Sequence, residues 1–280
     1  MSFSAPPRRA GWLERPDCRI RYEVTGQGPA IVFAHGLGGN LLSWWQQVAH
    51  FATRYTCVAY SARGFFPSTA PATGPDPREY AGDVAALVDE LGLGDIRMIC
   101  QSMGGWSGVE YALSRPGRVK ALVLAATTGT LDPRQMREPE RSRLAAWNIE
   151  SAAAREALIA RDILPAGGAT MAETQPALHQ LYHHITNLTQ GFDREAFRAR
   201  LHAQRSRNPE EFAAARTPVL FVPCEEDVVI PPFAPAAMAP VIPGARVSPL
   251  PKAGHSGHFE YAAAFNAKVD AFFNEVGADA

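Results

Sequence analysis

Short apolar runs alternate with segments of helical spacing along most of this chain. Six apolar runs predict buried strands, at residues 30–34, 55–60, 96–100, 119–126, 218–222 and 245–250. Apolar and polar residues alternate at 18–24, which predicts an edge strand. Helical spacing separates these runs, at residues 44–51, 76–91, 103–113 and 259–276. Strands that alternate with helices predict an α/β fold, in which a mostly parallel sheet has helices on both faces.

The strand pattern stops in the middle of the chain. Helical spacing there predicts four helices, at residues 134–147, 149–163, 171–188 and 193–207. We therefore expect one core domain, residues 1–129 and 217–280, interrupted by a helical cap insertion, residues 130–216. Such an insertion would cover the carboxyl edge of the sheet, where ligands bind in open α/β folds.

Composition limits the class of protein. A length of 280 residues with 46% hydrophobic content suits one large domain with an insertion. The net charge of −1 gives no basic excess that would attract nucleic acid or a membrane surface. The N-terminus lacks the apolar core of a signal peptide, and the four cysteines have no paired or metal-like spacing. We expect a cytoplasmic protein with a small-molecule substrate. Whether the chain forms a homo-oligomer stays open.

The stretch Ile96 to Gly105 places a serine directly after a predicted buried strand. Ser102 follows Cys100-Gln101, precedes Met103-Gly104, and helical spacing begins at once. A serine on so tight a turn stands clear of the sheet at the start of a helix, as in the G-x-S-x-G nucleophile elbow. Cys100 replaces the first glycine of that pattern. The same residues would also suit an ordinary serine that caps the following helix.

The chain also offers the two other members of a catalytic triad. Asp227 lies in the loop after the strand at 218–222, and His255 lies in the loop after the strand at 245–250. Serine, acid and histidine in this order are typical of α/β-hydrolases. The histidine would take the serine's proton, and the acid would orient the histidine. Taken alone, Asp227 suits a helix cap and His255 a solvated loop position.

Backbone donors for an oxyanion hole are predicted after the strand at 30–34. His35-Gly36-Leu37-Gly38 follows that strand, and Gly36 allows a turn that a side chain would block. The N–H groups of Leu37 and Met103 would then point at one spot and stabilise a developing oxyanion. The alternative is a plain glycine turn between strand and helix.

These motifs together resemble the α/β-hydrolase superfamily, in its group of capped serine hydrolases. The matching segments are His35-Gly36, Arg63-Gly64, Ser102-Met103-Gly104-Gly105, Asp227-Val228-Val229 with Pro231, and Gly254-His255. The resemblance extends from about Val24 to Val276. It implies an α/β-hydrolase fold with Ser102 as nucleophile, His255 as base and Asp227 as orienting acid.

The resemblance also settles two ambiguities and shows departures. Asp227 is preferred over Glu225 and Glu226 because it leads into Val228-Val229 and the proline, and His255 is preferred over His258 because it directly follows a glycine. The family usually has an aspartate at the position of Ser61 and a glycine shortly after the Arg-Gly turn, where this chain has Phe65-Phe66. None of the departures removes a triad member.

The resemblance implies hydrolysis through an acyl-enzyme, with no metal or organic cofactor. An ester or a lactone is the favoured substrate. Hydrolysis of a carbon–carbon bond in a meta-cleavage-type or β-diketone substrate is the alternative, although Ser256 stands where such enzymes often carry tryptophan. A small-molecule binding protein or a perhydrolase on the same fold is less favoured.

Two further groups of residues are compatible either with a functional site or with a purely structural role. His179, His183 and His184 have helical spacing but no acidic or third ligand nearby, so a cap helix is preferred over a metal site. Five aromatic residues either line the substrate pocket or pack in the core: Trp44, Trp45, Phe65, Phe66 and Trp106.

Overall fold

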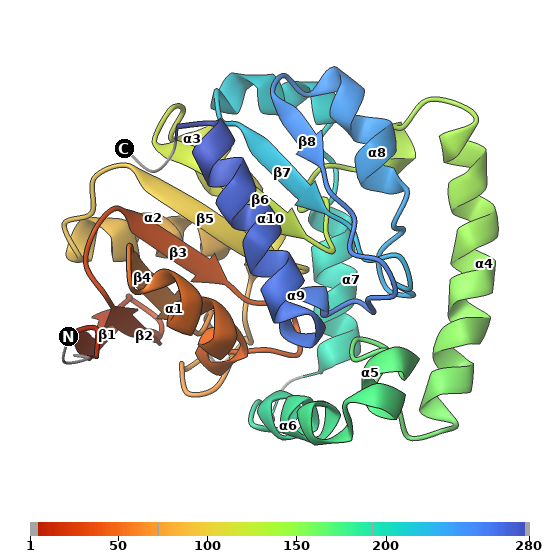
Figure 1. Ribbon diagram of the computed structural model, residues 1–280, viewed down its shortest axis with the longest axis horizontal. Helices are drawn as coiled ribbons and strands as arrows, with labels where there is room; N and C mark the ends of the chain where they lie inside the picture. Colours follow the sequence, from red (N-terminus) through yellow and green to blue (C-terminus); the bar gives the residue numbers. More distant parts are fainter. Residues whose placement is uncertain (1–4, 72, 192, 278–280) are drawn as a thin grey trace.

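A single twisted sheet organises the molecule. The computed structural model describes residues 5–71, 73–191 and 193–277 (Figure 1). Within them, eight strands form one sheet in the order β1-β2-β4-β3-β5-β6-β7-β8. The strands are β1 (Arg8–Glu14), β2 (Arg19–Thr25), β3 (Ala30–Ala34), β4 (Thr56–Tyr60), β5 (Ile96–Gln101), β6 (Val119–Ala125), β7 (Val219–Val222) and β8 (Ala245–Val247). From β4 to β8 along this order, every pairing is parallel, as the alternation of strands and helices predicts.

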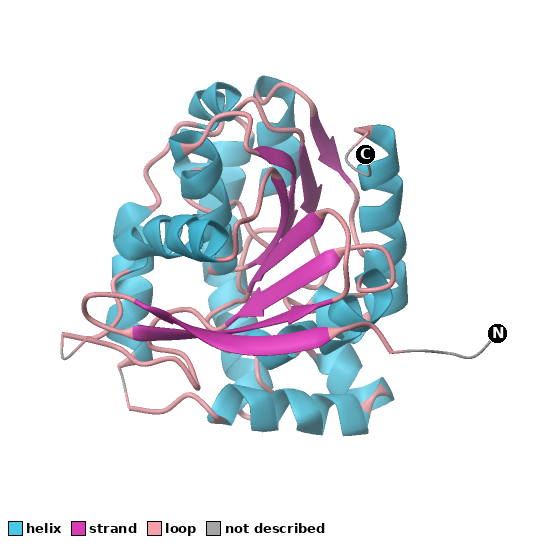
Figure 2. Cartoon of the chain, turned by 90° about the vertical axis from the view of Figure 1, so that its left-hand side faces the viewer, coloured by secondary structure: helices cyan, strands magenta, loops and turns pink. Residues whose placement is uncertain are grey.

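Helices cover both faces of the sheet, which is why its central strands are buried along their whole length. On one face, an apolar cluster joins the sheet to α2 (Tyr80–Glu90) and α3 (Gly104–Ser114). On the other face, a second cluster joins it to α1 (Trp45–Phe51) and α10 (Ala262–Glu275). Figure 2 shows the sheet between these helices. The prediction of a covered, mostly parallel sheet is confirmed.

The ends of the sheet differ in detail from the expected strands. β1 pairs antiparallel with β2, although no strand was expected at its position. Leu13 is the only buried residue of β1, so its apolar pattern is weak. At the other end, β8 stops at Val247, three residues before the expected end at Leu250. Leu250 instead joins the chain after β7 through an isolated bridge to Cys224.

Helices occupy the chain between β6 and β7. They are α4 (Glu140–Ile159), α5 (Ala169–Thr174), α6 (Pro176–Asn187) and α7 (Arg194–Gln204). We propose that residues 130–216 act as a cap on the site, and we refer to them as the cap. Two helix predictions here were wrong. α4 runs through the expected break at Asn148, because asparagine costs little inside a helix. The expected helix at 171–188 is split before Pro176, whose ring cannot continue a helix.

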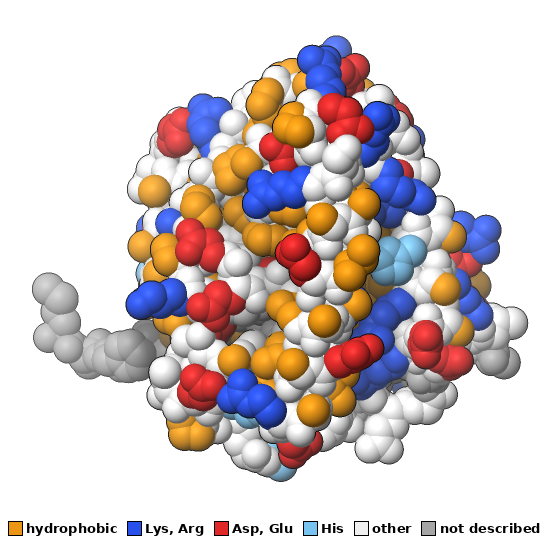
Figure 3. Space-filling view, turned by 90° about the vertical axis from the view of Figure 1, so that its right-hand side faces the viewer, with side chains coloured by type: hydrophobic (Ala, Val, Ile, Leu, Met, Phe, Trp, Pro, Cys, Tyr) orange, Lys and Arg blue, Asp and Glu red, His pale blue; other side chains and the backbone are white. Residues whose placement is uncertain are grey.

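Helix α4 stands at one side of the molecule and is mostly exposed. Only Ser151 of its twenty residues is buried, and Ile149 and Ile159 are 76% and 63% exposed. Figure 3 looks onto this side, where hydrophobic side chains are interspersed with charged ones of both signs. This agrees with the near balance of twelve arginines and eleven acidic residues in the cap.

Short helices complete the chain. The remaining α-helices are α8 (Ala234–Met238) and α9 (Gly257–Glu260). The 3₁₀-helices are η1 (Leu41–Trp44), η2 (Pro77–Glu79), η3 (Pro133–Gln135), η4 (Pro209–Ala215) and η5 (Ala239–Val241). None of the helices in the described residues combines the length and apolar character that a membrane crossing requires.

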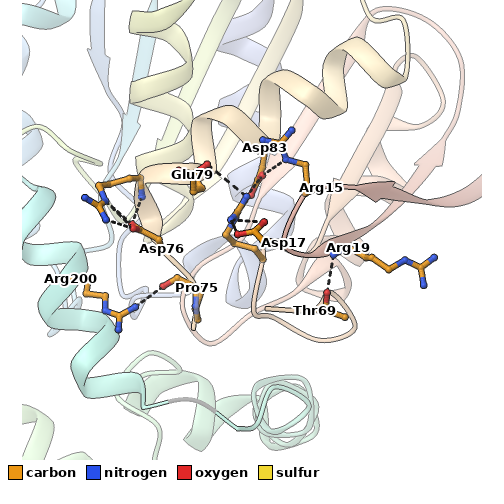
Figure 4. Close-up of polar contacts among 11 residues, drawn as sticks. Arg15, Asp17, Arg19, Thr69, Pro75, Asp76, Glu79, Asp83 and Arg200 are labelled. Carbon is orange, nitrogen blue, oxygen red and sulfur yellow. Dashed lines mark hydrogen bonds and ion pairs between the residues drawn. The ribbon is translucent and has the colours of Figure 1, made fainter. Parts of the chain in front are cut away.

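A buried ion pair fixes the Arg-Gly turn that follows β4. Arg63 binds both carboxylate oxygens of Asp83 on α2, at 2.6 and 2.7 Å, and both side chains are 2% exposed. Arg15 adds a bond of 2.9 Å to Asp83, and Asp17 lies 3.0 Å from Arg63. Figure 4 shows Arg15, Asp17 and Asp83 converging at this point. The two carboxylates compensate the buried guanidinium, so the turn is firmly tied to α2.

Candidate active site

Ser102 lies on a strained turn between β5 and α3. Its φ is 49°, in the left-handed region that residues other than glycine seldom adopt. The turn is held by a hydrogen bond of 3.0 Å from the Ser102 N–H to the carbonyl of Ala125. A methyl group added to Gly104 would lie 2.0 Å from the carbonyl oxygen of Ala34. A side chain is therefore excluded at Gly104, as the elbow pattern requires.

Cys100 replaces the first elbow glycine because the helix opposite makes room for it. A methyl group added to Gly108 of α3 would lie 2.6 Å from Cys100 Sγ, so the thiol uses the space that Gly108 leaves. Burial raises the pKa of the Cys100 thiol, which therefore stays protonated and packs as a small apolar group.

Ser102, His255 and Asp227 lie in one hydrogen-bonded line. His255 Nε2 is 2.8 Å from Ser102 Oγ, and His255 Nδ1 is 2.8 Å from Asp227 Oδ2. The other oxygen of Asp227 accepts hydrogen bonds from the backbone N–H groups of Val229 and Ile230 at 2.7 and 3.0 Å. Asp227 and His255 are each 4% exposed. With Nδ1 donating to the carboxylate, Nε2 is free to accept the serine proton.

The neighbouring candidates lie elsewhere. Glu225 and Glu226 are exposed, and Glu226 accepts a hydrogen bond of 2.7 Å from Thr170 of the cap. His258 is 3% exposed and packs against Trp44 at a ring distance of 4.6 Å. Burial lowers the pKa of His258 to about 3, so its imidazole is neutral and apolar in character. None of these three reaches Ser102 Oγ by a hydrogen bond in the described part of the chain.

The turn after β3 packs directly against the elbow. A methyl group added to Gly36 would lie 3.1 Å from Ser102 Cβ and 2.0 Å from the side-chain oxygen of Gln101. Leu37 directly follows Gly36 on this turn. Among the described residues, none accepts a hydrogen bond from the N–H of Leu37 or of Met103. Both donors are thus available, and their role as an oxyanion hole stays a prediction.

His35 fixes the same turn through its ring. Its Nδ1 lies 2.8 Å from the carbonyl of Gly36, and its Nε2 accepts a hydrogen bond of 2.9 Å from the N–H of Ala62. Burial lowers the pKa of His35 to about 4, which keeps the ring neutral. A neutral ring with Nδ1–H suits both contacts, so His35 supports the turn rather than exchanging protons.

Two side chains hold the histidine loop and were not anticipated from the sequence. Gln101 Nε2 donates to the carbonyl of His255 at 3.1 Å, and Glu260 accepts a hydrogen bond of 2.8 Å from the N–H of Gly254. Burial raises the pKa of Glu260 to about 7. The position of Gln101 beside the nucleophile was a usable signal. No sequence signal pointed to Glu260, because its contact with Gly254 depends on the fold.

The cap also holds the loop of the acid. Arg155 of α4 donates to the carbonyl of Val228 at 2.6 Å, directly after Asp227. This contact joins residues 73 positions apart in the chain. Sequence spacing did not predict this contact. Arg155 is also one of many arginines in the chain, so its residue type gave no signal.

The remaining candidates are structural or exposed. Trp44 and Phe65 are 0% exposed and Trp106 is 4% exposed, so these three pack in the interior. Trp45 and Phe66 are 48% and 46% exposed.

The cap histidines form no metal site in the described residues. His179 and His183 pack ring against ring at 4.7 Å, while His184 lies 3.2 Å from Gln180. No group of three or more histidine, cysteine or acidic residues in the described part of the chain is arranged to hold a metal ion.

Known proteins resemble this chain over most of its length. The model of the alpha/beta hydrolase family matches residues 31–268. A Mycobacterium tuberculosis (strain H37Rv) protein, provisionally named non-heme bromoperoxidase BpoC, is 28% identical, with 92% of this chain and 99% of that protein covered. The 3-oxoadipate enol-lactonase 2 of Acinetobacter baylyi is 34% identical over 126 residues, which are 44% of this chain and 47% of the lactonase.

Solved structures share the fold. Est816, described as an N-acyl homoserine lactone degrading enzyme, superposes with a TM-score of 0.75 at 24% identity, covering 94% of this chain and 100% of Est816. The enol-lactonase from Burkholderia xenovorans LB400 superposes with a TM-score of 0.70 at 24% identity, covering 92% of this chain and 97% of the lactonase. At this identity the likeness concerns the fold alone.

Proposed function

The chain belongs to the α/β-hydrolase family, and from this premise we propose that it is a serine hydrolase of small carboxylic esters or lactones. The observation that carries the proposal is the line of two 2.8 Å contacts from Ser102 through His255 to Asp227. The names of the similar proteins add support for the substrate class, because lactonases and esterases recur among them.

The proposed reaction begins with attack of Ser102 Oγ on the acyl carbon. His255 Nε2 takes the serine proton as the new C–O bond forms, and Asp227 stabilises the resulting imidazolium. The N–H groups of Leu37 and Met103 donate to the oxyanion of the tetrahedral intermediate. When the intermediate collapses, the alcohol oxygen leaves with the proton from His255, and the acyl group stays on Ser102.

Water completes the cycle. His255 removes a proton from a water molecule, which attacks the acyl carbon and forms a second tetrahedral intermediate. Its collapse returns the proton to Ser102 Oγ and releases the acid. A lactone follows the same steps, except that the leaving hydroxyl stays on the acyl chain, so water releases a single hydroxy acid from Ser102. No step requires a metal ion or an organic cofactor.

The test combines active-site labelling with turnover. We expect a fluorophosphonate probe to modify wild-type protein at Ser102, and p-nitrophenyl butanoate to be hydrolysed. Ser102→Ala should abolish labelling and lower kcat by several orders of magnitude, because loss of a triad serine has such effects in serine hydrolases, about 10⁶-fold in one studied case. The matched control is Ser114→Ala, at the far end of α3, where the Ser114 hydroxyl donates to the carbonyl of Tyr111. Undiminished turnover in Ser102→Ala would contradict the proposal.

A further inference from the structure

Helix α6 of the cap lies on the loops that carry the candidate catalytic groups. Tyr182 of α6 contacts Ser256, the residue after His255, through hydroxyl oxygens 2.8 Å apart. One turn later, the carbonyl of Ile185 accepts a hydrogen bond from Asn40, beyond the turn that carries Leu37. In Figure 1, α6 lies next to α5 and close to α9, which begins just after the histidine loop. Helix α6 therefore contacts both the segment after Leu37 and the segment after His255.

Three buried hydroxyl groups at this contact carry more protons than the described residues accept in hydrogen bonds. Ser256, Tyr182 and Thr186 are 1%, 7% and 4% exposed. Ser256 and Tyr182 carry two protons, and their mutual hydrogen bond uses one. Thr186 Oγ1 has no hydrogen-bond partner among the described residues. Burying a polar group without a partner is costly, so such groups in native proteins call for an explanation.

Two of these hydroxyls, those of Tyr182 and Thr186, border the space that a side chain at Gly38 would enter. A methyl group added to Gly38 would lie 3.4 Å from Thr186 Oγ1 and 3.7 Å from the hydroxyl oxygen of Tyr182, and these are among its three nearest neighbours. Gly38 directly follows Leu37, the proposed oxyanion donor. The space thus lies next to the proposed oxyanion turn, and the hydrogen bond between Tyr182 and Ser256 links it to the histidine loop.

We propose that Tyr182 and Thr186 are specificity residues that donate hydrogen bonds to a second oxygen of the substrate, beyond the oxygens of the bond that is cleaved. This inference rests on the proposed function and narrows its substrate class. Hydroxyl groups are neutral donors, so a neutral acceptor, a carbonyl or ether oxygen, is the group that suits them. The preferred substrates are esters or lactones that carry such an oxygen within a few bonds of the acyl carbon.

The experiment uses substrates that differ by one atom. On the acyl side, p-nitrophenyl methoxyacetate is compared with p-nitrophenyl butanoate; on the alcohol side, 2-methoxyethyl butanoate is compared with butyl butanoate. In each pair an ether oxygen replaces a methylene group. The preference is the ratio of kcat/KM for the oxygen substrate to kcat/KM for its partner. Intrinsic reactivity cancels when this ratio is compared between enzymes.

Removing the donors should lower that preference. We expect Tyr182→Phe and Thr186→Val each to reduce the ratio for at least one pair by about five- to tenfold, the range of a net hydrogen bond between neutral groups. Gly38→Ala should reduce it as well, because the added methyl fills the space without a close clash. Having three independent variants keeps the test decisive if one of them folds poorly.

The control separates specificity from loosening of the cap. Thr189 also joins the cap to the core, but its hydroxyl accepts a hydrogen bond of 3.0 Å from the N–H of Phe66. Thr189→Val should affect both members of a pair equally. If the three test variants leave both ratios unchanged, the inference is wrong, while the proposed hydrolysis stands. If wild-type protein hydrolyses none of the four esters, the proposed function itself fails.

Discussion

Asp227 and Glu226 are adjacent carboxylates with different surroundings. Asp227 is buried against His255, whereas Glu226 is exposed and bonds Thr170. We expect Asp227→Asn to lower kcat by about 10⁴-fold, as loss of the orienting charge does in serine proteases, because His255 would no longer be held with Nδ1–H toward an anion. Steady-state kinetics with p-nitrophenyl butanoate measures the effect.

Glu226→Gln is the matched control for this prediction. It removes one exposed charge from the same loop and should change kcat by less than about threefold, as surface substitutions usually have small effects. A larger loss in Glu226→Gln than in Asp227→Asn would show that the wrong carboxylate had been assigned.

The proximity of the three candidate catalytic residues was predictable because each of them follows the end of a strand. Parallel strands bring their carboxyl ends to one edge, so Ser102, Asp227 and His255 were expected to lie together from chain order alone. Contacts between distant segments were not predictable in this way. Tyr182 meets Ser256 across 74 residues, and its hydroxyl has the same sequence signal as that of any other tyrosine on a helix.

At the scale of elements, the contact between β5 and α3 explains the unusual elbow. Cys100 on the strand and Gly108 on the helix act as a complementary pair, since the thiol lies where a side chain at position 108 would begin. We expect Gly108→Ala to destabilise the protein by about 1–3 kcal/mol through overpacking. In the Cys100→Ala background, Gly108→Ala should destabilise the protein less, because the Sγ atom is absent.

The double-mutant cycle measures this coupling by urea unfolding of the wild type, both single variants and the double variant. A coupling of about 1 kcal/mol is expected for residues in direct contact. Leu122 lies 2.9 Å from the added methyl and limits the rescue, so full recovery is not expected. Strict additivity of the two substitutions would contradict the pairing of Cys100 with Gly108.

Element predictions succeeded where the apolar pattern was strong and failed where it was interrupted. The buried runs at β3, β5 and β6 were found within one or two residues, because strands buried on both faces are mostly apolar. β1 presents a single buried residue, so its pairing with β2 rather than its sequence makes it a strand. The break before Pro176 was readable from the proline, whereas asparagine costs too little inside a helix to end α4 at Asn148.

For the whole molecule, three buried groups with displaced pKa values contribute to the dependence of stability on pH. Burial lowers the pKa of His35 to about 4 and that of His258 to about 3, from an ordinary value of 6.5. Burial raises the pKa of Glu260 to about 7, from 4.5. All three are at most 5% exposed. Their protonation therefore differs between the folded and unfolded chain over the range between pH 4.5 and 6.5.

The two kinds of group act in opposite directions in this range. Each histidine is neutral when folded and protonated when unfolded, so the unfolded chain binds more protons and stability falls as pH falls. Glu260 is protonated when folded and ionised when unfolded, so its contribution rises as pH falls and is lost as pH rises through about 7. Among these three groups, two histidines against one carboxyl leave a net difference of about one proton.

From these three groups we expect a fall of about 1 kcal/mol in the free energy of unfolding between pH 6 and pH 5, since one proton is worth about 1.4 kcal/mol per pH unit. In Glu260→Gln the opposing group is absent, so the fall should be about 1 kcal/mol larger than in the wild type. The amide oxygen of the substituted side chain can still accept the hydrogen bond from Gly254, so the loop is expected to keep its place.

Urea unfolding at the two pH values measures both slopes. The control is Glu225→Gln, which removes an exposed carboxylate and is expected to keep the wild-type slope. Equal slopes in wild type and Glu260→Gln would mean that Glu260 is ionised in the folded protein, and the loop of the candidate base would then be held by a buried charge instead of a neutral acid.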